Sequence, residues 1–203
     1  VGTFALPEAV LIYPAFLHTL PKTEMLSGFA EMIKTALAFD ALLFEELLTT
    51  NVEDLREKRK DLIFKTAKLK HKVASKDLHD QHIRQCLNFG HTLGHAFESL
   101  FSEKGKEISH GVAVAAGMIC ETFISGQLTG LLKKEMIQIQ SYLQNNFPQP
   151  EINAMDIDQM LHIIRHDKKV SGDESKLSLL TQTGKCQPRI TCPEKIIRKS
   201  LEH

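Results

Sequence analysis

Apolar residues recur at the spacing of an α-helix through most of this 203-residue chain, and that repeat limits its fold more than any other feature. Between residues 21 and 38, Met25, Phe29, Met32 and Ala36 fall three or four positions apart, which puts them on one helical face. The same pattern predicts further helices at residues 41–48, 51–75, 90–100, 110–124, 131–145 and 157–166. The sequence therefore predicts a mainly α, multi-helix domain.

Polar residues predict where several of these helices begin. Asn51 is a predicted N-cap, and acidic residues follow it in the first turn, where the helix dipole favours them. Ser109 and Asp156 are predicted caps of the helices that follow them. The helix after Ser109 is rich in small residues, so we expect it to be buried among its neighbours.

Extended segments are predicted at the two ends of the chain. Residues 3–6 and 9–13 are two short extended pieces around Pro7. A lone strand pair is not stable by itself. We therefore expect this stray N-terminal strand to belong to a sheet whose other strands are missing from the sequence.

Alternating polarity returns only near the C-terminus. Residues 176–182 and 186–190, joined around Gly184, predict a small β-hairpin. Pro193 then fits the first turn of a closing helix.

Composition argues for a soluble globular protein without a global charge bias. The hydrophobic fraction is 42% and the charged fraction 25%, both ordinary values. Lysine plus arginine equals aspartate plus glutamate, at 25 each, so no net field recruits nucleic acid or an anionic membrane. The four cysteines form no C-x-x-C pair and are predicted to be reduced thiols of a cytoplasmic protein. No apolar run approaches the ~20 residues of a membrane helix.

Two histidines four residues apart are the strongest chemical signal. His91, His95 and Glu98 stack on one face of the predicted helix at residues 90–100. Such a pair commonly offers a divalent metal two ligands, although the imidazoles could instead cap local hydrogen bonds. His110 is then a third candidate ligand, because a catalytic zinc takes three protein ligands and keeps one open position. Alone, it would be an ordinary surface or capping residue.

Several charged residues admit two interpretations. Glu31 and Lys34 share a helix face and form either a solvated ion pair or the wall of a site. Lys70 interrupts an apolar face and either snorkels to solvent or contacts an anion. The segment 166–169 precedes Gly172 and is either a phosphate clamp or a polar turn. The eleven glycines include no G-x-G, so the chain has neither a dinucleotide fingerprint nor a P-loop.

With these residues in view, the chain resembles the 3-dehydroquinate synthases, the sugar-phosphate cyclases of the shikimate pathway. Three segments carry the resemblance in order: residues 26–34 (LSGFAEMIK), residues 70–98 around NFGHTLGHAFE, and residues 110–118 (HGVAVAAGM). Asp-Lys-Lys at 167–169 fits as well, and the resemblance runs from residue 1 to about residue 184.

The resemblance implies a domain organisation. Residues 1–20 would end a missing N-terminal NAD-binding domain, and residues 21–200 would form the helical metal- and substrate-binding domain. The start at Val1 rather than methionine fits a chain that begins inside a longer reading frame. Residues 201–203 (Leu-Glu-His) are similar to the start of a histidine tag, although a native ending is the alternative.

Carried over by position, the resemblance makes Glu31, His91 and His110 the ligands of Zn²⁺ or Co²⁺. His95 becomes a catalytic group that contacts the substrate phosphate and assists proton transfer. This implied role replaces the interpretation of His95 as a second metal ligand.

The resemblance also assigns the candidate substrate contacts. Lys70, Arg84 and Asn88 match residues that hold the substrate carboxylate and hydroxyls, and Lys34 matches a substrate-contacting lysine. Lys168, in preference to the adjacent Lys169, matches a lysine on the phosphate side.

The implied reaction converts 3-deoxy-D-arabino-heptulosonate 7-phosphate into 3-dehydroquinate and phosphate. Zinc would bind and acidify two substrate hydroxyls, and NAD, held by the missing domain, would transiently oxidise one. The resemblance further implies a homodimer. Three positions depart from the family pattern, since Val112 and Asp80 stand where glutamate is usual and His82 where glycine is common.

Three other functions compete with this one. A sister cyclase would take another sugar phosphate. A helical HD-type metal phosphohydrolase would use His166 and Asp167 and need no NAD. A non-catalytic helical module would bind no metal.

Overall fold

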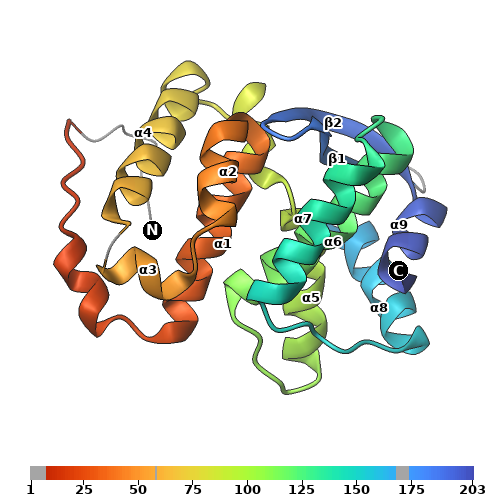
Figure 1. The fold of residues 1–203 in the computed structure, drawn as a ribbon. Helices are drawn as coiled ribbons and strands as arrows, with labels where there is room; N and C mark the ends of the chain where they lie inside the picture. The colour runs from red at the N-terminus through yellow and green to blue at the C-terminus, as the bar shows by residue number, and fades with distance from the viewer. Residues whose placement is uncertain (1–7, 58, 168–173) are drawn as a thin grey trace.

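The computed structural model describes residues 8–57, 59–167 and 174–203 (Figure 1). The α-helices and strands are α1 (Lys22–Phe39), α2 (Ala41–Leu48), α3 (Val52–Glu57), α4 (Lys60–Lys76), α5 (His91–Glu103), α6 (His110–Leu128), α7 (Lys133–Asn146), α8 (Ala154–Asp167), β1 (Glu174–Gln182), β2 (Lys185–Pro193) and α9 (Glu194–Glu202). Two 3₁₀ helices, η1 (Pro14–Thr19) and η2 (Ile83–Asn88), precede α1 and α5. The predicted mainly α fold with one C-terminal hairpin is confirmed.

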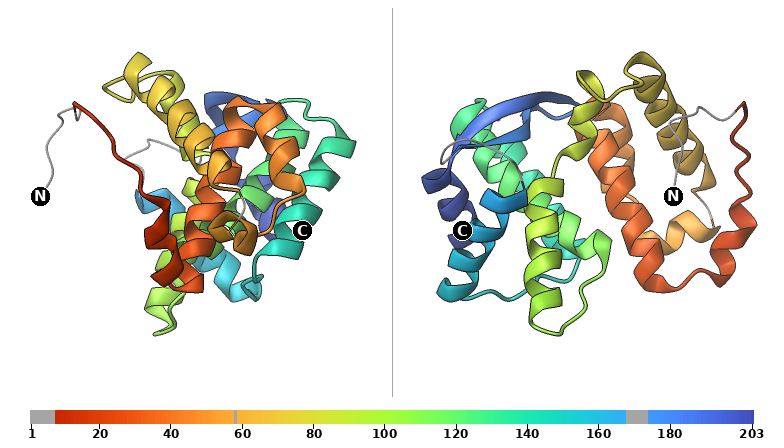
Figure 2. Two further views of the ribbon diagram at one scale, coloured as in Figure 1. Left: turned by 60° about the vertical axis from the view of Figure 1, so that its left-hand side comes forward. Right: turned by 180° about the vertical axis from the view of Figure 1, so that it is seen from behind.

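The helices form two groups that share one central helix. Figure 1 shows α1 to α4 on one side of the molecule and α5, α8 and α9 on the other, and the view from behind in Figure 2 shows the same division. Val114 and Met118 of α6 pack into the core of the first group, whereas Ala113 and Ile124 pack into the core of the second. A helix that is apolar on all sides is expected to be buried in this way.

By length and composition, α6 could also cross a membrane, although 67% of its most apolar window is buried inside the protein. This high burial is what the core helix of a packed domain shows. The small residues predicted to allow tight packing therefore serve the protein interior.

The C-terminal hairpin packs against both groups of helices, because its residues contribute to both cores. β1 and β2 pair in antiparallel register, from Glu174 opposite Pro193 to Gln182 opposite Lys185. In the turn, the backbone N–H of Gly184 donates to the carbonyl oxygen of Leu37 at 2.8 Å, which ties the hairpin to the end of α1. The predicted hairpin and closing helix are both confirmed.

The single helix predicted at residues 51–75 is wrong, because the structure has two helices there. Asn51 does cap the first, since its side-chain oxygen accepts the backbone N–H of Asp54 at 3.0 Å. The chain then breaks at Arg59, whose backbone is not helical (φ −114°, ψ 40°). The Arg59 guanidinium donates to Glu46 at 3.0 Å and to Thr50 at 3.2 Å, and these tertiary contacts outweigh the helical pattern of the sequence.

Two predicted caps also differ from the structure. α8 begins at Ala154, and Asn153 rather than Asp156 accepts its first free backbone N–H groups. Asp156 returns the bond by accepting the N–H of Asn153 at 2.9 Å, as in a capping box. Ser109 stands at the N-cap of α6, but its side chain makes no capping hydrogen bond.

The predicted strand at residues 9–13 is not formed, and residues 3–6 lie outside the described part of the chain. Val10 and Leu11 are exposed, at 65% and 94%. A strand needs a hydrogen-bonding neighbour, and the two described strands pair with each other. At the other end, Leu201 packs into the core of the second group, at 8% exposure.

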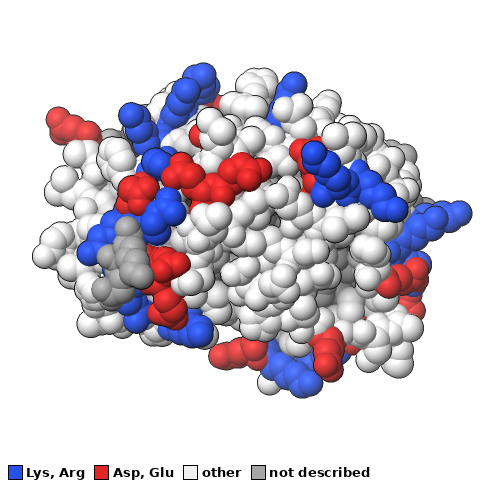
Figure 3. Space-filling view, in the orientation of Figure 1, with Lys and Arg blue, Asp and Glu red and all other residues white. Residues whose placement is uncertain are grey.

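Charged side chains of both signs are intermixed on the face drawn in Figure 3. Blue and red atoms alternate over the side occupied by α3 and α4, and much of the remaining face is uncharged. This distribution agrees with the equal numbers of basic and acidic residues in the sequence.

Candidate metal centre

Three helices bring one carboxylate and two imidazoles together. Glu31 comes from the middle of α1, and His91 and His110 are the first residues of α5 and α6. One ligand atom from each residue lies within 4.8 Å of the other two. Nε2 of His91 is 3.4 Å and Nε2 of His110 is 4.0 Å from Oε1 of Glu31. Within the described residues, this is the one cluster of three or more potential ligands.

Each imidazole is held from its far side. Nδ1 of His91 lies 3.4 Å from the carbonyl oxygen of Phe89, and Nδ1 of His110 lies 2.9 Å from Oε1 of Glu98. With Nδ1 occupied as a donor, Nε2 is the nitrogen that faces Glu31 in both residues. Histidine ligands of metals are oriented by carbonyl or carboxylate partners in this way. The set therefore fits a divalent cation such as zinc.

A hydrogen bond between α1 and α6 fixes Glu31 against His110. The backbone N–H of Gly111 donates to Oγ of Ser27 at 3.1 Å. Ser27 lies one turn before Glu31, and Gly111 follows His110 directly. The start of α6 is thus held beside the turn of α1 that carries the carboxylate.

Two lysines surround this carboxylate. Nζ of Lys34, which is 2% exposed, lies 2.7 Å from Oε1 of Glu31 and 3.5 Å from Nε2 of His91. Nζ of Lys70 lies 3.2 Å from Oε2 of Glu31. Lys34 is therefore buried at the cluster and does not form a solvated ion pair with Glu31. Lys70 reaches Glu31 with a side chain that stays half exposed.

The charge of Glu31 is stabilised by its neighbours. Burial acts to raise the pKa of its carboxyl group, but the hydrogen bond with His91 and the charges of Lys34 and Lys70 outweigh burial and hold that pKa far below its ordinary value. Burial lowers the pKa of Lys34, and the charge of Glu31 opposes this effect.

In metal-free buffer, Glu31→Gln is expected to lower the free energy of unfolding at neutral pH by about 2 kcal/mol, because it leaves Lys34 buried beside a neutral group. A depressed folded-state pKa stabilises the protein above the unfolded pKa of about 4.3, and that contribution is lost as the pH falls from there toward the folded pKa. The difference between wild type and variant should therefore shrink in acid. Urea unfolding between neutral pH and about pH 3 measures it.

Glu24→Gln provides the matched control, since Glu24 lies exposed on the same helix. It should change stability by less than about 0.5 kcal/mol at every pH. A Glu31→Gln difference that stays constant into acid would contradict the assignment of a depressed pKa to Glu31.

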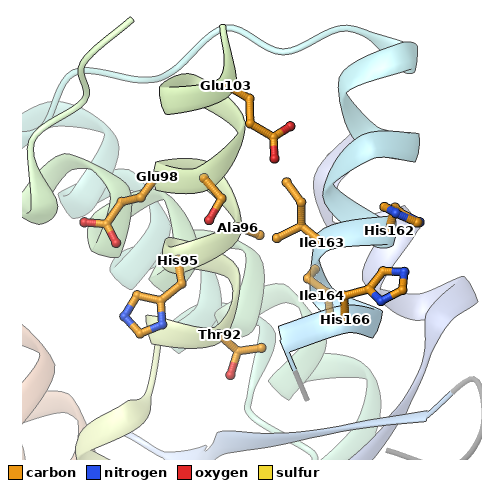
Figure 4. Close-up of a pocket in the computed structure, with 10 residues that line it drawn as sticks. Thr92, His95, Ala96, Glu98, Glu103, His162, Ile163, Ile164 and His166 are labelled. Atoms are coloured by element: carbon orange, nitrogen blue, oxygen red, sulfur yellow. The ribbon is translucent and has the colours of Figure 1, made fainter. Parts of the chain in front are cut away.

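His95 lies beside the cluster without joining it. Its ring centre is 5.5 Å from that of His91, and the two rings are nearly perpendicular. His95 lines a pocket of about 540 Å³ between α5 and α8. Figure 4 shows His95 and Glu98 projecting from α5, with His162 and His166 across the pocket on α8. The spacing of four residues thus does not bring both histidines of α5 into the three-residue cluster.

The other predicted substrate contacts lie along the approach to α5. Arg84 is half-buried in η2, and its Nη1 donates to the carbonyl oxygen of Leu78 at 3.1 Å. Asn88 ends η2 and is exposed. The predicted phosphate contacts Lys168 and Lys169 lie outside the described residues.

Glu98 is the hydrogen-bond partner of the candidate ligand His110. Val112, where the resemblance implies that a glutamate is usual, is buried, and the carboxylate of Glu98 contacts Nδ1 of His110. The sequence did indicate that Glu98 lies near the site, because Glu98 falls on the same helix face as His91. Its partner on α6 could not be predicted, because the packing of the two helices is not visible in the pattern.

His166, the histidine of the phosphohydrolase alternative, lies outside the three-residue cluster. His166 packs against His162, one turn earlier on α8, with ring centres 4.3 Å apart. Neither residue belongs to the three-ligand cluster found among the described residues.

The chain is similar to known proteins over most of its length. The family model described as 3-dehydroquinate synthase C-terminal matches residues 28–170. Proteins named 3-dehydroquinate synthase are similar over the whole chain: the one from Parabacteroides distasonis is 33% identical and that from Bacillus cytotoxicus 34%, with 100% of this chain covered in both. The chain covers 58% and 54% of these relatives, so it spans little more than half their length.

Solved structures of two related enzymes share the fold. A 2-epi-5-epi-valiolone synthase from Streptomyces hygroscopicus, with NAD⁺ and Zn²⁺ bound, has a TM-score of 0.75 at 21% identity, covering 93% of this chain and 53% of its own. A 2-deoxy-scyllo-inosose synthase complexed with carbaglucose-6-phosphate, NAD⁺ and Co²⁺ has a TM-score of 0.71 at 22% identity, covering 90% and 52%. At these identities, the likeness shows the fold alone.

Proposed function

The chain belongs to the 3-dehydroquinate synthase family, and we propose that it forms the metal- and substrate-binding part of such an enzyme. The proposed activity is that of a phosphorus–oxygen lyase. It converts 3-deoxy-D-arabino-heptulosonate 7-phosphate into 3-dehydroquinate and phosphate in the shikimate pathway.

The convergence of Glu31, His91 and His110 is the observation that carries this proposal. These three residues lie up to 79 positions apart in the sequence, and each falls in one of the three segments that resemble the family. Their ligand atoms nevertheless lie within 4.8 Å of one another. We propose that they hold Zn²⁺ or Co²⁺, the ions that the two related enzymes bind.

A divalent ion held there would supply Lewis acidity toward the substrate hydroxyls, and NAD would supply hydride transfer. The sequence contains no G-x-G, so we propose that NAD is held by a separate N-terminal domain. The related enzymes that bind NAD⁺ are nearly twice as long as this chain.

The chain's own residues would bind and orient an anionic substrate. Lys34 and Lys70 place two ammonium groups at the cluster, and Arg84 offers a planar fork suited to a carboxylate. His95 opens into the pocket between α5 and α8, where its imidazole could exchange a proton with a substrate phosphate. Lys168 would contact the same phosphate, and Asn88 the hydroxyls.

We also propose that the enzyme is a cytoplasmic homodimer that binds neither nucleic acid nor membrane. The free thiols of all four cysteines support a reducing compartment. The dimer rests on the family resemblance.

The zinc-loaded chain is expected to bind the heptulosonate 7-phosphate in a zinc-dependent manner and to release no phosphate, because the proposed NAD site belongs to a separate domain. Calorimetry measures the binding, and a phosphate assay with and without NAD measures turnover.

Cyclisation by the isolated chain with NAD would contradict the prediction that the chain is inactive by itself. Phosphate release without NAD would favour the phosphohydrolase. If a carboxylate-free heptulose phosphate bound more tightly than the heptulosonate 7-phosphate, the result would favour a sister cyclase. It would mean that Arg84 does not bind a substrate carboxylate.

A further inference from the structure

A fully buried carboxylate lies in the middle of α6. Glu121 is 0% exposed and is the one acidic residue between His110 and Leu128. Burying a carboxylate costs several kcal/mol unless hydrogen bonds compensate it. The compensating donors therefore show what this residue does in the fold.

Two of these donors are backbone N–H groups at the start of α5. The N–H of Gly90 donates to Oε2 of Glu121 at 2.7 Å, and the N–H of Leu93 donates to Oε1 at 3.4 Å. Gly90 occupies the N-cap of α5 and has no side chain that could accept the N–H of Leu93. Glu121 thus caps α5 from a neighbouring helix, and the dipole of α5 favours a negative charge at this end.

The backbones of the two helices touch beside this cap. A Cβ atom on Gly117 would lie 2.0 Å from the carbonyl oxygen of Gly90. Gly90 itself has a φ of +78°, which favours glycine. The position of the first turn of α5 is therefore set by contacts with the turn of α6 that carries Gly117 and Glu121.

From these contacts we infer that Glu121 is a positioning residue for the candidate metal centre, on which this inference rests. His91 follows Gly90 directly and is the first residue of α5, while His110 is the first residue of α6. By anchoring the start of α5 on α6, Glu121 sets His91 in register with His110. Glu121 makes this contribution through the backbone and need not touch the metal.

The Co²⁺-loaded chain provides the test, because the visible d–d absorption of Co²⁺ reports ligand geometry without any turnover. Glu121→Gln keeps the shape of the side chain but turns an amide NH₂ toward a backbone N–H. It is expected to weaken Co²⁺ binding by about tenfold, as loss of an outer partner does, and to change the absorption. A folded Glu121→Gln variant with unchanged affinity and absorption would overturn the inference.

Ile124→Ala is the matched control. Ile124 is 0% exposed and lies one turn further along α6, so its truncation leaves a cavity but keeps the carboxylate that accepts the N–H groups of Gly90 and Leu93. This variant should lose stability yet bind Co²⁺ within about twofold of wild type, because the capping hydrogen bonds of α5 are retained. An equal loss of affinity in both variants would reduce Glu121 to a general contributor to stability and overturn the inference.

Amide exchange in the wild type keeps the test valid if Glu121→Gln does not fold. The Gly90 and Leu93 amides should exchange as slowly as the most protected core amides. Rapid exchange of either would overturn the capping role. If the wild type itself bound no Co²⁺, the proposed metal centre would fail as well, and this outcome is distinct from unchanged binding by the variant.

Discussion

Replacing His91 with alanine is expected to weaken zinc binding by roughly 100-fold. Structural zinc sites bind with ~10–16 kcal/mol spread over four ligands, or roughly 3 kcal/mol for each, and about 1.4 kcal/mol corresponds to a factor of ten. His91 contributes one of three candidate ligands, and its Nε2 lies 3.4 Å from Glu31. Competition with a chromophoric chelator measures the affinity, and elemental analysis measures the zinc content per chain.

His95→Ala is the matched control, because it removes the same group one turn further along α5. His95 is exposed and lies outside the three-ligand cluster, so zinc affinity should stay within about threefold of wild type. An equal loss in both variants would mean that the pair chelates one ion, as spacing alone suggests. Loss on His166→Ala, with His91→Ala harmless, would instead support the phosphohydrolase.

Gly117→Ala is expected to lower the free energy of unfolding by about 3 kcal/mol or more, at the upper end of the cost of overpacking. The new methyl group would lie 2.0 Å from the carbonyl oxygen of Gly90 and 2.6 Å from the backbone nitrogen of Gly94. Both atoms belong to the backbone, so neither can rotate away. Urea denaturation measures the change.

Gly28→Ala should have the opposite sign. Gly28 is an exposed residue of α1, and an added Cβ would meet nothing within 4 Å. Alanine is a better helix former than glycine by about 1 kcal/mol, so this variant should be slightly more stable. Wild-type stability in Gly117→Ala would contradict the close contact between α5 and α6.

The helices that the sequence predicted correctly are those whose ends are set locally. The helix at residues 41–48 agrees with α2 residue for residue, because its pattern and its flanking residues are local signals. The break at Arg59 was missed because it depends on contacts with Glu46, which lies in α2, and with Thr50, which follows that helix. The strand predicted at residues 9–13 failed because its pairing partner had to come from elsewhere.

The candidate site could also be predicted only in part, because the sequence identifies residues but not how the helices pack. Spacing alone identified His91 and His95, but their separate placement depends on where α1 and α6 cross α5. His110 was a third candidate from the sequence, the resemblance to a family added Glu31, and the structure brings His91, His110 and Glu31 together. Glu121 was missed altogether. Its signal was a lone acidic residue in an otherwise apolar and small-residue helix, which indicates a buried carboxylate in need of donors.

The shared position of α6 makes the two groups of helices thermodynamically inseparable. One face of α6 completes the core around α1, and the other completes the core around α5 and α8. Detaching this helix would expose both interiors at once, so the domain should unfold as one cooperative unit. An ion that binds only the folded chain would then raise the melting temperature of the entire domain, even though its ligands occupy one small region.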